Sequence, residues 1–215
     1  MIQSPANKVI VHPAARYTKN ITELMKRSAI QNGASVDPAD VVNIVGEVIS
    51  LPKVISPTND YKGFSLKDIK VGDTAIFSYK VIYDVIIKNE GEEPIYRNSV
   101  IYEGKEYFTC DIRNLFGVIR NGEIIMVNGF VMLEEYEEGK IILPASLKKQ
   151  KNAASSRIRY IGSNRTHLPK ITAEQGDEVF YNSKQAQHYQ INDKRFIIMQ
   201  QEKILGKVTD KTVVK

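Results

Sequence analysis

Short apolar runs separated by turn residues dominate the chain. Runs of β-branched and aromatic residues alternate with polar ones or continue unbroken, and Gly, Asn, Asp and Pro bound them. This pattern is typical of short β-strands. The predicted strands cover residues 9–12, 46–51, 74–79, 81–87, 98–102, 106–110, 123–133, 157–161, 178–181 and 195–199. Strands this short and this numerous predict an all-β fold of the barrel or sandwich kind.

The same pattern occurs twice along the chain. Three blocks recur in order: a turn and a strand, a Gly-Asp turn that leads into a strand, and a longer closing run with a glycine near its end. They lie at residues 7–11, 71–77 and 103–119 in the first half and at 128–132, 175–181 and 192–208 in the second. Repeats of this kind predict two copies of one structural unit.

The boundary between the copies is predicted near an Asn-Gly turn at 121–122, which precedes a long apolar run. We therefore expect a first unit over residues 1–120 and a second over 121–215. The first unit is longer because of two insertions, at residues 53–66 and 87–100, the second of which has the pattern of a hairpin.

Two segments without strand signals follow the first strand of each unit, at residues 13–43 and 139–156. The first contains a helical pattern over 20–30, which Asn20 and Glu23 would cap. The second carries three consecutive apolar residues, Ile141, Ile142 and Leu143, followed by polar and small residues. Two interpretations stay open: the triplet is a strand of the core, or it belongs to a mobile loop and enters a groove on a partner.

Composition restricts the class of protein. The chain has 215 residues, 42% of them hydrophobic and 26% charged, and no apolar run approaches the roughly 18 residues that span a bilayer. The N-terminus lacks a secretory or transit pattern, and the single Cys110 permits no intrachain disulfide, so we expect a cytoplasmic protein without a membrane segment. The net charge of +5 keeps nucleic acid in consideration, although the charge is dispersed apart from a run at 148–151, which is typical of a solvated loop.

Catalytic patterns are missing from the sequence. His12, His167 and His188 lack the spacing of metal ligands, and Cys110 has no companion thiol. No GxGxxG, GxSxG, HExxH or GxxxxGK[ST] motif occurs. The acidic run at 134–138 is best interpreted as a solvated face. We therefore expect that the protein is not an enzyme and binds neither a cofactor nor a metal.

The ordered blocks resemble the GroES-like co-chaperonins. Residues 7–11 (NKVIV) resemble the family's opening strand, 46–49 (GEVI) the strand after its mobile loop, and 69–77 (IKVGDTAIF) its Gly-Asp strand. In the second half, residues 139–146 resemble the start of the mobile loop, and 176–180 and 196–208 the closing strands. The zinc-dependent alcohol dehydrogenases contain a similar domain, but this chain lacks their dinucleotide-binding motif.

The resemblance implies a fold and a function. It implies two tandem small β-barrels, each with a mobile loop, and a homo-oligomeric ring that caps a GroEL-type chaperonin, the partner that binds ATP. The apolar tripeptide of the family's loop matches Ile141, Ile142 and Leu143. The first loop departs from the pattern and has Ile21, Leu24 and Met25 at the corresponding place.

Two other classes of function stay open. A β-barrel that binds nucleic acid would use the basic charge together with tyrosines such as Tyr160, Tyr181 and Tyr189, which could stack on bases. These aromatics are not grouped with Lys and Arg on one predicted strand pair, so nucleic acid is the less favoured partner. A structural phage or capsid protein has no support beyond the content of strands.

Overall fold

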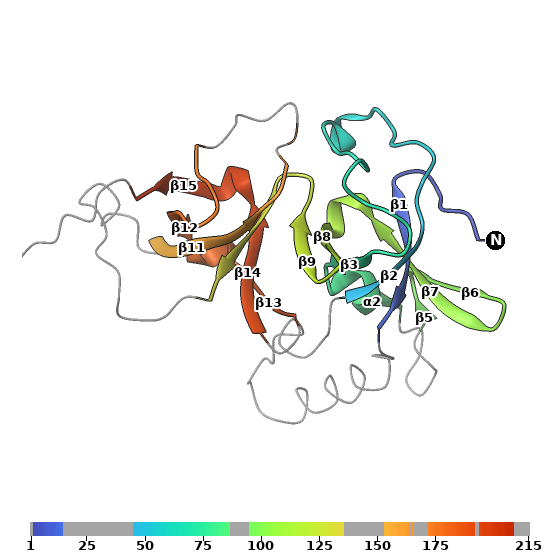
Figure 1. Cartoon of the computed structure of the whole chain (residues 1–215). Helices are drawn as coiled ribbons and strands as arrows, with labels where there is room; N and C mark the ends of the chain where they lie inside the picture. The colour runs from blue at the N-terminus through green and yellow to red at the C-terminus, as the bar shows by residue number, and fades with distance from the viewer. Residues whose placement is uncertain are drawn as a thin grey trace, which may run out of the picture.

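The computed structural model (Figure 1) describes residues 2–14, 45–86, 95–135, 153–163, 165, 172–191 and 194–208. These residues are mainly strands, and the prediction of an all-β fold is confirmed. The elements before the middle of the chain are β1 (Lys8–Pro13), β2 (Val45–Ser50), η2 (Asn59–Tyr61), β3 (Thr74–Phe77), α2 (Lys80–Tyr83), β4 (Val85–Ile86), β5 (Ile95–Tyr96), β6 (Ser99–Tyr102), β7 (Lys105–Asp111), η3 (Ile112–Asn114), β8 (Leu115–Arg120) and β9 (Glu123–Met126). Those after it are β10 (Phe130–Glu134), β11 (Ala153–Ile161), β12 (Glu178–Asn182), η4 (Ser183–Gln185), β13 (Gln187–Ile191), β14 (Lys194–Gln200), η5 (Gln201–Lys203) and β15 (Ile204–Lys207).

Two antiparallel sheets repeat one strand order. The first sheet runs β6-β7-β1-β2-β3-β8-β9, and the second runs β13-β14-β10-β11-β12-β15. Each strand of the second sheet thus has a counterpart in the first, and only β9 has none. Figure 1 shows the two sheets side by side, with β8 and β9 between them.

The registers of the strands repeat as well. Val11 pairs with Val48 next to an irregularity in β1, and Leu133 pairs with Ile158 next to the same irregularity in β10. The closing strands follow the alignment of 103–119 with 192–208, because Ile76 pairs with Gly117 and Phe180 pairs with Gly206.

The predicted alignment of the opening strands is one position out. Val9 pairs with Cys110, and its counterpart Val131 pairs with Met199. Val9 therefore corresponds to Val131 and not to Phe130. The turn before β10 has two residues with positive φ, Asn128 (54°) and Gly129 (76°), whereas the turn before β1 has one, Asn7 (63°), so aligning the two asparagines shifts the strands by one residue.

Each sheet encloses its own core, and the alternation of side chains along the strands explains how. Alternate residues of β1 and β10 face these cores, Val9 and Val11 in the first and Val131 and Leu133 in the second. Counterparts also fill the same places elsewhere, as Phe77 and Tyr181 do at the ends of β3 and β12. A third apolar cluster lies between the sheets and contains residues of both.

Several predicted strands are wrong in their bounds. Residues 123–133 form two strands, because a turn at 127–129 separates β9 from β10. Residues 80–83 form the short helix α2, in which Val81 and Ile82 are buried against the first core, so packing outweighs their β-propensity. Within the segment predicted to lack strands, residues 153–156 begin β11, and β13 lies in a polar stretch that gave no signal.

The strand pairings bear on two further predictions, the closed barrels and the boundary at residue 120. Among the described residues, no strand pairing joins the two edges of either sheet, so the pairings define open sheets instead of closed barrels; in the first sheet the edge of β8 is occupied by β9. The first sheet also extends past the predicted boundary at residue 120, and membership changes between Met126 and Phe130. Sheet membership alone does not divide a chain into domains, so the division 1–120 and 121–215 stays a prediction.

The structure describes the whole of the insertion at 53–66 and part of the insertion at 87–100. Residues 53–66 are described throughout and include η2. The insertion at 87–100 has a hairpin base, where β4 pairs with β5, while its tip at 87–94 lies outside the described residues. No helix in the described part of the chain has the length and apolar character needed to cross a membrane.

Candidate functional site

The predicted docking residues lie outside the described residues. This holds for Ile141, Ile142 and Leu143 of the second loop and for Ile21, Leu24 and Met25 of the first, as well as for the predicted helix at 20–30. The structure instead describes the strands from which both segments leave and to which they return.

The first segment leaves at the end of β1 and returns at the start of β2. Pro13 pairs with Gly46, and the Ala14 N–H donates to the Val45 carbonyl at 3.2 Å. The two strands approach closely here, since a Cβ on Gly46 would lie 2.7 Å from the His12 carbonyl oxygen. Glycine is thus required at this position for β1 and β2 to pair.

The second segment leaves and returns at the corresponding place. It departs after β10 and returns at β11, and the hydroxyl of Ser156 donates to the Glu134 carbonyl at 2.7 Å. Ser156 stands where Gly46 stands in the first sheet, because Arg157 pairs with Glu178 as Glu47 pairs with Thr74. The two segments are therefore carried by equivalent strand ends.

A hollow of about 490 Å³ opens beside the exit of the second segment. Apolar side chains and a charged rim line it: Ile124, Tyr160, Ile191 and Phe196, with Glu134, Glu135, Arg159, Lys194 and Arg195. The rim is internally paired, with Arg195 3.4 Å from Glu135 and Arg159 3.9 Å from Glu134. Such partly exposed pairs contribute little to stability. Glu134 and Glu135 are both accessible to solvent, and the rest of the acidic run at 134–138 lies outside the described residues.

The two Gly-Asp turns have the same construction. The Asp73 carboxylate accepts from the Lys70 N–H at 2.7 Å, and the Asp177 carboxylate accepts from the Glu174 N–H at 2.7 Å. Gly72 and Gly176 both have positive φ, 89° and 91°. In each unit the turn hydrogen-bonds to the strand after the loop, through Val48 in the first and Ile158 in the second. The turns thus hold the returning strand of each loop.

The charged partners of these turns differ between the units. Arg120 binds Asp73 through two hydrogen bonds of 2.8 and 2.7 Å, which lower the pKa of this buried carboxyl below its usual value. Asp177 instead contacts Lys207 at 2.7 Å, and this contact lowers its pKa as well. The first unit therefore has the more rigid turn, because a bidentate guanidinium fixes geometry better than a single ammonium.

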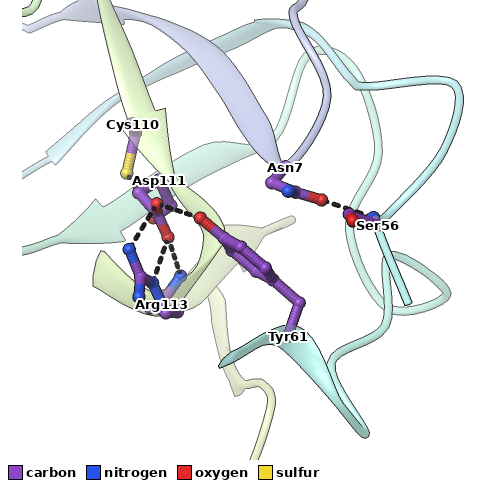
Figure 2. A network of polar contacts seen from close by, with 6 residues as sticks. All are labelled: Asn7, Ser56, Tyr61, Cys110, Asp111 and Arg113. Carbon is purple, nitrogen blue, oxygen red and sulfur yellow. Dashed lines mark hydrogen bonds and ion pairs between the residues drawn. The ribbon is translucent and has the colours of Figure 1, made fainter. Parts of the chain in front are cut away.

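The insertion at 53–66 is fastened to the first sheet by a polar network (Figure 2). The Tyr61 hydroxyl donates to Asp111 at 2.7 Å, and Arg113 contacts the same carboxylate from the other side at 2.9 Å. Although burial raises the pKa of Asp111, these hydrogen bonds lower it more, and the net pKa is below the usual value. A second bond joins the Ser56 N–H to the Asn7 side chain at 2.6 Å.

The end of this insertion and the residues just after it contact the second unit. The Ser65 N–H donates to the Asn128 side chain at 2.8 Å, and beyond the insertion Asp68 accepts from the Ser163 hydroxyl at 3.0 Å. These contacts join residues far apart in the sequence, and no local pattern could have predicted them.

The described residues considered for other chemistry do not form a site, and His167 lies outside the described ranges. Within the described ranges, no three His, Cys, Asp or Glu residues are grouped as metal ligands would be. Cys110 is fully buried, which raises the pKa of its thiol. Of the three tyrosines considered for stacking on bases, Tyr181 and Tyr189 are buried in apolar clusters and are inaccessible to a nucleic acid.

Comparison with known proteins identifies a class for the second half of the chain. Residues 121–208 match the model of a family of chaperonin subunits. This family is described as the chaperonin 10 kDa subunit, or Cpn10, to which the GroES-like resemblance also leads. A search of curated protein sequences finds no match. The match supports a function of the general co-chaperonin kind, and the family implies a chaperonin as partner.

Proposed function

We propose that the protein is a two-unit co-chaperonin that caps an ATP-dependent chaperonin ring and assists protein folding. The family match over residues 121–208 carries the proposal. The repeated strand order extends it to the first half, since every strand of the matched sheet has a counterpart there. The partner is a GroEL-type ring, which binds and hydrolyses the ATP.

Docking is assigned to the two segments between equivalent strand ends. In the second, Ile141, Ile142 and Leu143 supply an apolar tripeptide; in the first, Ile21, Leu24 and Met25 stand at the corresponding place. A loop that becomes ordered on binding loses conformational entropy, about 1–2 kcal/mol per residue of backbone, so a single loop binds weakly. A homo-oligomeric ring compensates, because the remaining loops bind intramolecularly once the first has docked.

Weak binding of each loop also serves release. A modest change in the affinity of the chaperonin for one loop is multiplied over all loops of the ring, so the nucleotide state of the partner can control the whole lid. The strand ends that carry the two loops are held in place by hydrogen bonds to the carbonyl groups of Val45 and Glu134.

Nucleotide-dependent co-sedimentation with a purified bacterial chaperonin double ring tests the proposal. The intact chain should sediment with the chaperonin in the presence of ATP, and a variant with Ile141, Ile142 and Leu143 changed to serine should not. A control variant with Val54 and Ile101 changed to serine removes exposed apolar residues elsewhere and should still bind.

Two results would contradict it. Equal binding by the triplet variant would remove the loop assignment. No binding by the intact chain would remove the proposed partner, and binding of single-stranded nucleic acid with a steep salt dependence would then favour the alternative class.

A further inference from the structure

Three parts of the first unit meet around one hollow. They are helix α2, the base of the hairpin insertion, and the insertion that Tyr61 fastens to the sheet. The side-chain amide of Asn98, in the hairpin insertion, donates to the Val81 carbonyl of α2 at 3.1 Å. Tyr61 donates to Asp111, which lines the hollow (Figure 2). Both insertions of the first unit thus reach the same place.

This hollow, called the α2 hollow below, has a volume of about 510 Å³. Pockets that hold small molecules have volumes of about 300–1,000 Å³. Its lining is mainly polar and comes from β1, α2, β7, η3 and the turn before β6, with Lys8, Lys80, Asn98, Thr109, Asp111 and Asn114 among its residues. A molecule in the α2 hollow would therefore meet ammonium, amide and hydroxyl groups.

The second unit has apolar residues at matched positions. The registers match Lys8 with Phe130 and Thr109 with Ile198. Phe130 and Ile198 are buried in the apolar cluster that forms the junction between the two sheets around Phe116. The chain of the second unit also passes from β12 through η4 directly to β13, where the first unit has α2 and the hairpin insertion. The polar α2 hollow is therefore a departure from the repeat and belongs to the first unit.

The two carboxylates that line the α2 hollow are each paired with an arginine. Asp111 accepts from Arg113 at 2.9 and 3.0 Å, and the carboxylate of Asp84 lies 3.5 Å from the Arg97 guanidinium. Each arginine offsets the charge of its partner, so the two acids leave no net negative charge at the hollow.

Lys8 and Lys80 supply positive charge that is not offset in this way. Within the described ranges, neither ammonium group forms an ion pair with a carboxylate. A lysine ammonium is a compact charge that binds phosphate as a point charge. The side-chain amide of Asn114 and the hydroxyl of Thr109 can add hydrogen bonds to further oxygen atoms. Together these groups fit an anion that has several oxygens.

We propose that the α2 hollow binds a small phosphorylated sugar or polyol. Lys8 and Lys80 contact the phosphoryl group, and the amides of Asn98 and Asn114 contact hydroxyl groups of the same molecule. The described lining has no aromatic side chain on which a nucleobase could stack, so a sugar phosphate fits better than a nucleotide. This site goes beyond the proposed co-chaperonin function and does not depend on it.

Calorimetric titration of the full chain at constant ionic strength tests the binding. The probes are inorganic phosphate, glycerol 3-phosphate and glucose 6-phosphate, with glucose as the uncharged control. Saturable binding is expected, tighter for the sugar phosphate than for inorganic phosphate and missing for glucose. The double variant K8Q/K80Q should raise the Kd about tenfold or more, because two charged contacts are lost. The control K67Q/K105Q removes two exposed lysines outside the lining and should leave the Kd unchanged.

Two further measurements test the place of binding. T109I introduces the residue of the matched position in the second unit, so it fills the α2 hollow without a change of charge and should abolish binding while thermal unfolding shows a folded chain. In the natural chain, glucose 6-phosphate should shift the side-chain amide resonances of Asn98 and Asn114 in nuclear magnetic resonance spectra. The amide of Asn182, in the second unit, should not shift.

Several results would overturn the proposal. They are no binding of any of the three phosphate probes, equal loss of binding in the two double lysine variants, and shifts confined to amides outside the α2 hollow. Binding of a single-stranded oligonucleotide without binding of the small probes would overturn it as well and would indicate a nucleic-acid interface. Binding of glucose 6-phosphate by a chain that does not bind a chaperonin would support the site and contradict only the proposed function.

Discussion

Gly117 of β8 and Ile125 of β9 approach so closely that a Cβ on Gly117 would stand 2.7 Å from the Ile125 carbonyl oxygen. Gly206 occupies the counterpart position on β15, where the same methyl group would meet open space. Gly117 and Gly206 are thus equivalent in the repeat, but only Gly117 has a neighbouring strand packed against it. Gly117 allows the end of the first unit to join the beginning of the second.

Gly117→Ala should destabilise the chain, whereas Gly206→Ala should not. The first substitution forces β8 and β9 apart and disturbs Met126, which belongs to the junction, at a cost of about 1–3 kcal/mol in the free energy of unfolding. Urea unfolding of both variants measures the difference. Equal stabilities would show that the β8–β9 contact does not hold the sheets together.

Phe116→Ala should be among the most damaging substitutions at the junction. Removing this buried ring from between Phe130 and Tyr189 should cost about 3–5 kcal/mol. Leu205→Ala, at the matched exposed position, serves as the control and should change the free energy of unfolding by less than about 1 kcal/mol. Comparable losses for the two variants in denaturant unfolding would be evidence against a junction centred on Phe116.

The pair Asp73–Arg120 should make stability dependent on pH. Hydrogen bonds from Arg120 hold the pKa of Asp73 below its ordinary value of 3.8, so the folded state binds this proton less readily than the unfolded state. The resulting stabilisation is fully present above pH 3.8 and is lost as pH falls through the lower pKa of the folded state.

Asp73→Asn tests that dependence. At neutral pH the substitution should cost about 1–3 kcal/mol, because Arg120 loses a charged acceptor, and the deficit should shrink as the pH falls below 3.8. Asp177→Asn, whose partner Lys207 is more exposed, should have a smaller effect. A deficit of Asp73→Asn that does not vary with pH would mean that the carboxylate charge is not the cause.

Cys110 should be inert in the folded protein. Burial raises the pKa of its thiol, so little thiolate forms at pH 8 and no reagent reaches it. Reaction with a disulfide reagent should follow the unfolding of the first core, in which Cys110 is packed. Rapid labelling of the native protein would contradict the burial of β7.

Features that depend on neighbouring residues in the sequence could be predicted, whereas features that depend on contacts between distant residues could not. The Gly-Asp turns and the closing strands could be recognised because their signals are local: a Gly-Asp pair followed by an apolar run, with glycine at the position where the turn has positive φ, Gly72 and Gly176. Helix α2 was missed because burial of Val81 and Ile82 outweighs their preference for strands.

Contacts between distant residues could not be predicted. The hydrogen bonds of Ser65 with Asn128 and of Ser163 with Asp68 join the insertion at 53–66 and the residues just after it to the second unit, and their partners carry no shared pattern. Strand β9 was merged with β10 because only Asn128 and Gly129 separate their apolar runs, and only pairing with β8 assigns β9 to the first sheet. The candidate docking residues were predicted by resemblance alone and stay predictions, since they lie outside the described residues.

Hydrogen exchange on the complex tests the central claim most directly. With a GroEL-type chaperonin and ATP present, amides within residues 136–152 should become protected, together with those of 15–44 if the first loop docks, and omission of nucleotide should abolish the protection. Unchanged exchange in both segments, or protection confined to the faces of the sheets, would contradict the account of a lid held by its two loops.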